Sequence, residues 1–191
     1  DILPSVLCQM GRILLWMKEH NIAHMDIKPQ NFCIKNGNLT LIDWGFVSPV
    51  CKYSSRYSGT LQLADPAFFD IDGNKKKQAC CEYDMFSCGM SIIGLIAQKY
   101  RCVYGDFVSE MENTIKISQV YKKIKKVHGE EYVDIIKRMI ELDQTKRITP
   151  EELYNHPSLE EIRGKYPLRE PTPTTKGEEP TTVREEEGEE G

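Results

Sequence analysis

The sequence predicts a mainly α-helical fold with short β-hairpins, and three observations support this fold class. Apolar residues recur at three- and four-residue spacing over residues 2–17 and again over residues 132–140, as in a helix that buries one face. Residues 90–96 are almost all apolar, which is typical of a helix buried on every side. Asn36-Gly37 separates two short strand-like runs and is a strong hairpin signal.

Composition narrows the class of protein. The 191 residues are enough for one domain with its own core. The net charge is -4, but residues 170–191 hold eight Glu against one Lys and one Arg, a charge of -6. The rest is therefore near +2, which does not indicate nucleic-acid binding. Seven Cys without C-x-x-C spacing favour reduced thiols in an intracellular protein. No apolar run is long enough to span a bilayer, so we expect no membrane partner.

The first predicted helix covers about sixteen residues and ends near His20-Asn21. Asp1 can cap its start, and Pro4 stands in the first turn, where a missing N–H group costs little. We expect its Leu and Met side chains to be core.

A polar motif follows this helix: His24-Met25-Asp26-Ile27-Lys28-Pro29-Gln30-Asn31, and then Asp43-Trp44-Gly45. The pattern H-x-D-x-K-P-x-N followed by D-x-G resembles the catalytic loop and magnesium loop of eukaryotic-type serine/threonine protein kinases, in a divergent form. The Lys-Pro pair favours the serine/threonine branch. Aminoglycoside and choline kinases also carry H-x-D-x-x-x-x-N, so they stay an alternative at this point.

The resemblance implies phosphoryl transfer from ATP with Mg²⁺. Asp26 would be the catalytic base that receives the proton of the substrate hydroxyl. Lys28 would neutralise the transferred phosphate and so help to bind the nucleotide. Asn31 and Asp43 would be the magnesium ligands that hold the nucleotide phosphates. The hairpin between them, residues 32–35 and 39–42, is expected to bring both oxygen ligands to one metal.

Three supporting residues belong to the same resemblance. His24 is expected to be structural, packing beside the magnesium loop and bonding to backbone, and Gly45 completes D-x-G. Trp44 stands where Phe is more common, and its N–H donor is expected to hold the loop in one orientation.

Two departures from the family pattern have consequences. Met25 replaces an Arg that pairs with a phosphate on the activation segment, so we expect activity here not to depend on that phosphorylation. Ala67 replaces a Glu whose family partner corresponds to Arg147. Arg147 is therefore expected either to be solvated or to pair with Asp65 instead.

Residues 46–67 resemble an activation segment, and Thr60 matches a Thr that bonds both the catalytic Asp and the nearby Lys. Residues 70–77 resemble part of a calcium loop but lack its closing Glu, so we expect a polar loop. Residues 106–111 are expected to start a short helix. The basic stretch 115–127 is expected to be a solvated helix face rather than a dock for acidic partners.

Asp84 opens a D-x-F-S-x-G run that resembles the family's D-x-W-S-x-G. It is expected to accept N–H bonds from the catalytic loop; the plain alternative is an N-cap on a core helix. This motif separates protein kinases from aminoglycoside kinases. Thr149, with Pro150 and Glu152 after it, is expected to form a capping box.

Residues 1–166 are therefore expected to form the C-terminal lobe of a kinase domain. No G-x-G-x-x-G loop or V-A-I-K strand, which mark the family's N-terminal lobe, occurs in this sequence. We therefore expect a fragment of a longer protein, and the alternative is a protein that naturally lacks that lobe. Residues 167–191, rich in Pro, Thr and Glu, are expected to form a disordered acidic tail.

The expected function is ATP- and magnesium-dependent phosphorylation of Ser/Thr hydroxyls on protein substrates, with this chain inactive alone. The alternatives are a pseudokinase or interaction module without phosphotransfer, and a small-molecule kinase of the aminoglycoside or choline type.

Overall fold

The computed structural model describes residues 2–50, 52–54, 59–60, 63–68, 77–97 and 110–168. The helices in these ranges are α1 (Leu3–Glu19), α2 (Cys81–Ala97), α3 (Glu110–His128), α4 (Glu130–Met139), α5 (Pro150–Tyr154) and α6 (Glu160–Arg163). The short strands are β1 (Ile22–Ala23), β2 (Phe32–Lys35), β3 (Asn38–Leu41), β4 (Ser48–Pro49), β5 (Tyr53–Ser54) and β6 (Lys77–Gln78). The mainly helical fold class is confirmed.

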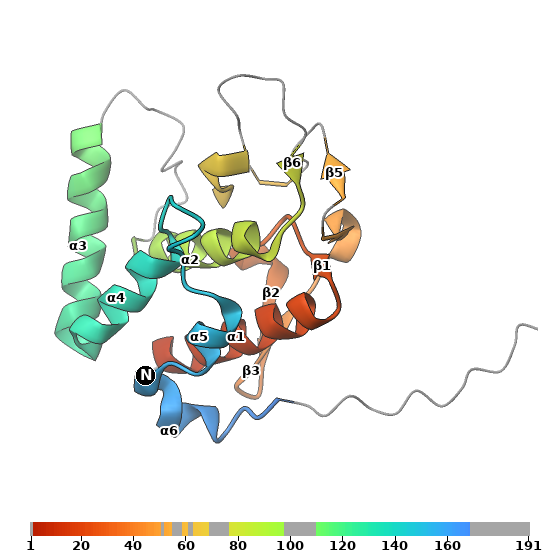
Figure 1. The fold of residues 1–191 in the computed structure, drawn as a ribbon. Coiled ribbons are helices and arrows are strands. Elements are labelled where there is room, and N and C mark those ends of the chain that lie inside the picture. The colour runs from red at the N-terminus through yellow and green to blue at the C-terminus, as the bar shows by residue number, and fades with distance from the viewer. Residues whose placement is uncertain are drawn as a thin grey trace, which may run out of the picture.

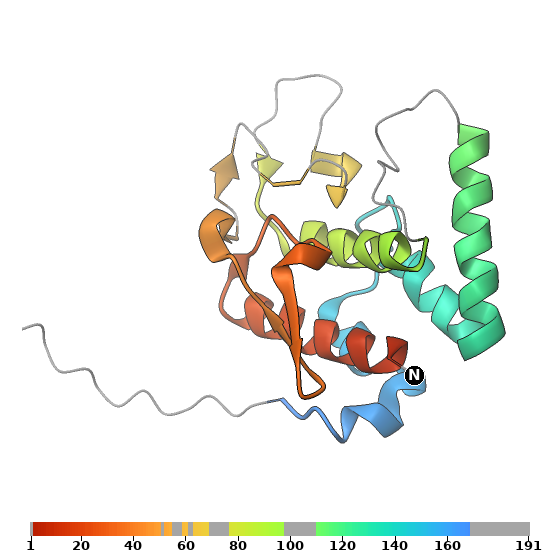
Figure 2. The same ribbon diagram turned by 180° about the vertical axis from the view of Figure 1, so that it is seen from behind.

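The strands pair as antiparallel ribbons of two, β1 with β4, β2 with β3 and β5 with β6. Helices α1 and α2 pack against each other in the middle of the fold, and α5 packs on α1 (Figure 1). Helix α3 stands at one edge beside α4, and the β2–β3 hairpin lies across α1 when the molecule is seen from behind (Figure 2).

Helix α1 confirms the predicted amphipathic helix, since its Leu and Met stripe lies in the core and Pro4 stands in its first turn. Its N-cap is Ile2, without a side-chain capping bond, and Asp1 lies outside the described residues. The helix ends at Glu19, one residue before the predicted end.

The predicted hairpin is also confirmed. Asn36 and Gly37 have φ angles of 50° and 77°, the left-handed pair that a type I′ turn requires. The register pairs Phe32 with Leu41 at the open end and Lys35 with Asn38 at the turn. The hairpin therefore returns the chain from Asn31 directly to the magnesium loop.

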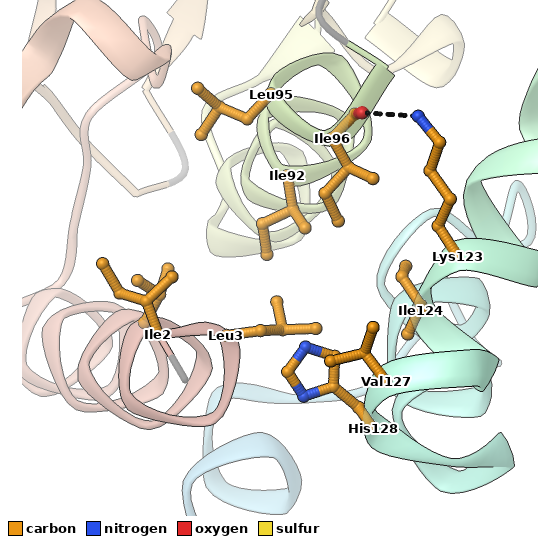
Figure 3. A pocket seen from close by; sticks show the side chains of 10 residues that line it. Ile2, Leu3, Ile92, Leu95, Ile96, Lys123, Ile124, Val127 and His128 are labelled. Carbon is orange, nitrogen blue, oxygen red and sulfur yellow. Dashed lines mark hydrogen bonds between the residues drawn. The ribbon is translucent and has the colours of Figure 1, made fainter.

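Helix α2 begins at Cys81, so Asp84 lies inside its first turn and the N-cap alternative is wrong. The expectation of burial on every side is wrong at its end, where Leu95 is 50% exposed. Leu95 lines an apolar groove of about 270 Å³ between α2, the start of α1 and the end of α3 (Figure 3). Lys123 reaches from α3 to donate to the Ile96 carbonyl at 3.5 Å.

Helix α3 is one helix from Glu110, where the sequence predicted a short helix from residue 106 and a separate one over 115–127. Its basic residues Lys122, Lys123, Lys125 and Lys126 are exposed, as predicted.

The capping box at the start of α5 is confirmed: Thr149 Oγ1 accepts from the Glu152 N–H group at 3.1 Å, and Glu152 Oε2 accepts from the Thr149 N–H group at 2.8 Å.

Several predictions lie outside the described residues. They include the loop at 70–76, the hydroxyl-rich stretch 55–58, the helix start at 106–109 and the tail from residue 169 on. Within the described ranges, no helix has both the length and the apolar character needed to cross a membrane.

Candidate active site

Asp84, in the first turn of α2, anchors the catalytic loop. Its two carboxylate oxygens accept the N–H groups of His24 at 2.6 Å and Met25 at 2.9 Å. Burial raises the pKa of Asp84 to about 7, although the two N–H donors favour its charged form. Met25 has a φ of 66°, so this anchor holds a non-glycine residue in the left-handed region. The predicted contact between Asp84 and the catalytic loop is confirmed.

Asp26 is 1% exposed, and its carboxylate accepts four hydrogen bonds from described residues. Its Oδ1 accepts from the Thr60 N–H group at 2.7 Å and from the Thr60 hydroxyl at 2.8 Å. Its Oδ2 accepts from Lys28 Nζ at 2.7 Å and from Asn31 Nδ2 at 3.3 Å. The predicted Thr60–Asp26 contact is confirmed. The predicted bond from Thr60 to Lys28 is not among the contacts of the described residues. Thr60 and Lys28 each bond the Asp26 carboxylate instead.

These donors set the charge of Asp26. Burial by itself raises the pKa of this carboxyl, but the hydrogen bonds from Lys28 and Thr60 outweigh burial and hold the pKa below its usual value. Asp26 is therefore an oriented carboxylate at neutral pH, as proton acceptance requires.

His24 is fully buried and its role in the geometry is structural. Its Nδ1 accepts the Asp26 N–H group at 3.3 Å, so Nε2 carries the proton and donates to the Ile42 carbonyl at 3.2 Å. Burial lowers the pKa of His24, which keeps this neutral tautomer in place. The predicted backbone bond beside the magnesium loop is confirmed.

Asn31 and Asp43 both lie at the open end of the hairpin, Asn31 just before β2 and Asp43 two residues after β3. The Ile42 N–H group donates to the Asn31 carbonyl at 2.8 Å and closes the hairpin base. Asn31 Nδ2 donates to the Asp26 carbonyl at 2.9 Å, which leaves its Oδ1 facing away as an acceptor. Asp43 is exposed, with a φ of 61°.

This donor set fits Mg²⁺, which takes oxygen ligands and is commonly held by one or two protein groups together with substrate phosphates and waters. Within the described residues, no group of three or more His, Cys, Asp and Glu forms a complete metal cage. Asn31 and Asp43 suit a metal ion whose remaining ligands are phosphate oxygens and water.

Trp44 has one hydrogen bond and two ring contacts within the described part of the chain. Its Nε1 donates to the Leu41 carbonyl at 3.3 Å, and its ring meets His24 edge-on with centroids 5.1 Å apart. Trp16, which the sequence patterns did not indicate, also meets Trp44 edge-on, with ring centroids 6.3 Å apart. A Cβ added at Gly45 would lie 3.4 Å from Asp43 Oδ1, an ordinary van der Waals contact, so Gly45 lies directly beside that carboxylate.

Asp65 takes the place of the missing Glu. Its Oδ2 lies 2.5 Å from Arg147 Nη1, and both side chains are buried. Gln144 donates to the same oxygen at 3.2 Å. Of the two predicted possibilities for Arg147, pairing with Asp65 is confirmed and solvation is wrong.

Met25 lies in a small apolar cluster with Ala23, Phe68, Ala79 and Tyr83. Phe68 and Tyr83 meet edge-on at 5.3 Å. An apolar contact therefore joins the catalytic loop to the end of the activation segment where the family pattern has a charged Arg.

The comparisons with known proteins agree with this geometry. A family model described as "Protein kinase domain" matches residues 2–159. A Wee1-like protein kinase of Arabidopsis thaliana is 26% identical over 160 residues, covering 83% of this chain and 30% of the relative. The serine/threonine-protein kinase ppk34 of Schizosaccharomyces pombe is 31% identical over 176 residues, covering 88% and 48%. The human serine/threonine-protein kinase ULK3 is 23% identical over 159 residues, covering 78% and 32%.

The chain thus spans from about a third to about a half of the length of these relatives. The family model, in contrast, covers most of the chain and includes the catalytic loop, the magnesium loop and Arg147. The chain belongs to the protein kinase family.

Proposed function

We propose that this chain supplies the catalytic and magnesium loops for transfer of the γ-phosphoryl group of ATP to Ser/Thr hydroxyls of protein substrates. The observation that carries the proposal is the Asp26 carboxylate, buried, ionised and bound by Lys28, Thr60 and Asn31. Phosphoryl transfer needs such a group to orient the attacking hydroxyl and receive its proton.

The hydrogen bonds of Asp26 differ in length, and this determines where a hydroxyl can enter. The 3.3 Å contact from Asn31 is the longest of the four. A substrate hydroxyl that donates to Oδ2 would replace this contact at the least cost, while Lys28 stays bound at 2.7 Å. Lys28, which is partly exposed, would then lie beside the phosphoryl group and balance its charge.

Asn31 and Asp43 would hold the metal. A Mg²⁺ ion held by these two residues would supply positive charge against the charge that develops on the phosphates during transfer. Asn31 would present Oδ1 because its Nδ2 is fixed by the Asp26 carbonyl, and Asp43 would present an exposed carboxylate.

Nucleotide binding would need a further polypeptide region. Large apolar side chains near the magnesium loop are exposed by 37–45%: Trp16, Ile42, Trp44, Phe46 and Val47. Exposed apolar side chains gathered beside a site are typical of a surface that another part of a protein covers. We propose that the kinase N-terminal lobe covers this surface, that this chain alone transfers negligible phosphate, and that the complete protein acts inside the cell.

The alternatives are less well supported. A pseudokinase would not need Asp26, Lys28, Asn31 and Asp43 together, yet all four are present and in contact with one another or across one hairpin. A small-molecule kinase is disfavoured by the match to the protein kinase family and by the Asp84 anchor.

The test is transfer of radiolabelled γ-phosphate by the complete gene product to a mixture of Ser-, Thr- and Tyr-containing peptides. Asp26→Asn is expected to reduce the rate by a factor of about 100 or more. Asp143→Asn, an exposed carboxylate that bonds Thr145 and Lys146, is the matched control and should leave the rate unchanged. Label found mainly on Tyr, or on an aminoglycoside or choline, would contradict the proposed substrate class.

A further inference from the structure

The hairpin that separates Asn31 from Asp43 has little support of its own. It is a ribbon of two strands with four residues each, and such a ribbon is marginally stable in water. Cys33, Ile34 and Lys35 on β2 are exposed, with Ile34 54% exposed. Leu39 and Leu41 attach β3 to the core, and polar contacts from elsewhere in the chain hold the tip.

Gln9 provides one such contact. It belongs to α1, is only 1% exposed, and is the one polar side chain among the buried residues of that helix. Its Nε2 donates to the Gly37 carbonyl at 2.9 Å, and its Oε1 accepts the Leu39 N–H group at 2.7 Å. One buried amide thus binds both the turn and the start of β3.

Tyr166 provides the second contact, from the far end of the described residues. Its hydroxyl donates to the same Gly37 carbonyl at 3.2 Å. Both ribbon views show the hairpin tip directed toward this blue segment after α6 (Figures 1 and 2). Tyr166 is itself fixed, because its carbonyl accepts the Tyr154 hydroxyl at 2.9 Å and Arg12 lies 5.9 Å from its ring centre.

Ser5 completes the arrangement and fixes the direction of every bond. Its hydroxyl accepts from Gln9 Nε2 at 3.1 Å and donates to the Tyr166 hydroxyl at 3.0 Å. Gln9 uses two amide hydrogens, Tyr166 donates its single hydrogen to Gly37, and the Gly37 carbonyl accepts through both lone pairs. A network with every donor used once has a single consistent geometry.

We propose that Gln9 and Tyr166 are positioning residues for the metal-binding pair Asn31 and Asp43, acting through the hairpin. This inference rests on the proposed function. The hairpin base is closed by the Ile42 N–H bond to the Asn31 carbonyl, and its tip is closed by Gln9 and Tyr166. Release of the tip would let the ribbon tilt about its base and change the relation between the two ligands.

Two variants of the complete protein test the proposal. Tyr166→Phe removes only the hydroxyl, and Gln9→Met keeps the length of the side chain but removes its hydrogen bonds. Tyr132→Phe is the matched control, because the Tyr132 hydroxyl makes one comparable bond, to the Ser158 carbonyl at 2.8 Å, away from the hairpin. The probe is Mn²⁺ with a non-hydrolysable ATP analogue, followed by electron paramagnetic resonance, with amide hydrogen exchange of residues 33–40 measured in parallel.

Tyr166→Phe and Gln9→Met are each expected to weaken Mn²⁺ binding about tenfold, as loss of outer contacts to metal ligands does. Hydrogen exchange of the hairpin amides is expected to become about tenfold faster in both. Tyr132→Phe should lower the melting temperature by about as much as Tyr166→Phe does, because each loses one hydroxyl. It should change neither the Mn²⁺ affinity nor the hydrogen exchange of the hairpin. Mn²⁺ affinity equal to wild type in Gln9→Met and Tyr166→Phe, or an equal loss in Tyr132→Phe, would overturn the proposal.

The wild-type protein separates this inference from the proposed function. If wild type binds no Mn²⁺ with the nucleotide analogue and transfers no phosphate, the proposed function fails, and no metal pair is left to position. If wild type binds and transfers but the two variants behave like Tyr132→Phe, only the inference fails.

Discussion

Arg147 and Asp65 form a buried ion pair at 2.5 Å across 82 residues of sequence. The guanidinium also donates to the Glu141 and Glu82 carbonyls, so Asp65 is the carboxylate that balances its charge. The Ala67 N–H group donates to Asp65 Oδ1 at 2.9 Å, which ties the pair to the end of the activation segment. A carboxylate two residues earlier thus replaces the Glu that the family pattern has at Ala67.

Removal of this carboxylate should be costly. Asp65→Ala leaves a buried cation uncompensated, and such a loss destabilises a fold by about 3–5 kcal/mol. Lys18→Met is the control, because its pair with Glu151 is also short, at 2.7 Å, but both side chains are 44% exposed. We expect the control to cost less than about 1 kcal/mol. Urea unfolding measures both, and equal losses would contradict the account.

The family position should rescue the variant. In Asp65→Ala/Ala67→Glu a carboxylate returns to the place where the family pattern has it, next to Arg147. We expect the double variant to recover at least half of the stability lost in Asp65→Ala. If the double variant is no more stable than Asp65→Ala, a carboxylate at position 67 does not reach Arg147, and the expectation is wrong.

Asp84 predicts a pH dependence of stability. Its pKa rises from 3.8 to about 7 on folding, so the folded state binds the proton more tightly. The stabilisation this provides is complete below about pH 4 and is lost as the pH rises toward 7. Asp84→Asn removes the titration, so its destabilisation should be smaller at pH 8 than at pH 5, by about 1–3 kcal/mol. If urea unfolding shows that Asp84→Asn lowers the free energy of unfolding equally at pH 5 and pH 8, the pKa of Asp84 is not raised on folding.

Met25 predicts independence from activation-segment phosphorylation. It packs against Phe68, Ala79 and Tyr83, so an apolar cluster holds the segment end without a phosphate. Phosphatase treatment of the complete protein should leave its transfer rate within about twofold. A large loss of rate on dephosphorylation, restored by rephosphorylation, is the opposite result.

The first turn of α5 depends on its capping box. Thr149→Ala removes the acceptor for the Glu152 N–H group and should lower the free energy of unfolding by about 1 kcal/mol. Thr149→Ser keeps the hydroxyl and should cost only a few tenths of that. The two variants are compared by thermal unfolding, and equal losses would contradict a role for the hydroxyl.

Local signals predicted much of the fold. The apolar spacing of α1, the Asn36-Gly37 turn and the box at Thr149 each depend on residues a few positions apart, so sequence patterns can show them. The donors to Asp26 come from two segments: Lys28 and Asn31 lie within five residues of it, and Thr60 lies 34 residues further on, in a segment that the family pattern already orders.

Long-range pairings were predicted less well. Asp65–Arg147 was one of two possibilities, since the choice depends on packing between segments 82 residues apart. Gln9 was missed, although a polar residue between Cys8 and Met10, in a stretch of buried apolar residues, was a usable signal. The exposure of Leu95 and the continuous α3 depend on how helices meet in space, which periodicity does not report.

The most direct measurement is magnesium-dependent γ-phosphoryl transfer to Ser/Thr peptides by the complete protein and its Asp43→Ala variant. The account predicts transfer by the wild type that requires Mg²⁺, and a loss of at least about 100-fold in the variant with its melting temperature unchanged. Folded wild-type protein that transfers no phosphate with Mg²⁺ and ATP, or an Asp43→Ala variant as active as wild type, would contradict it.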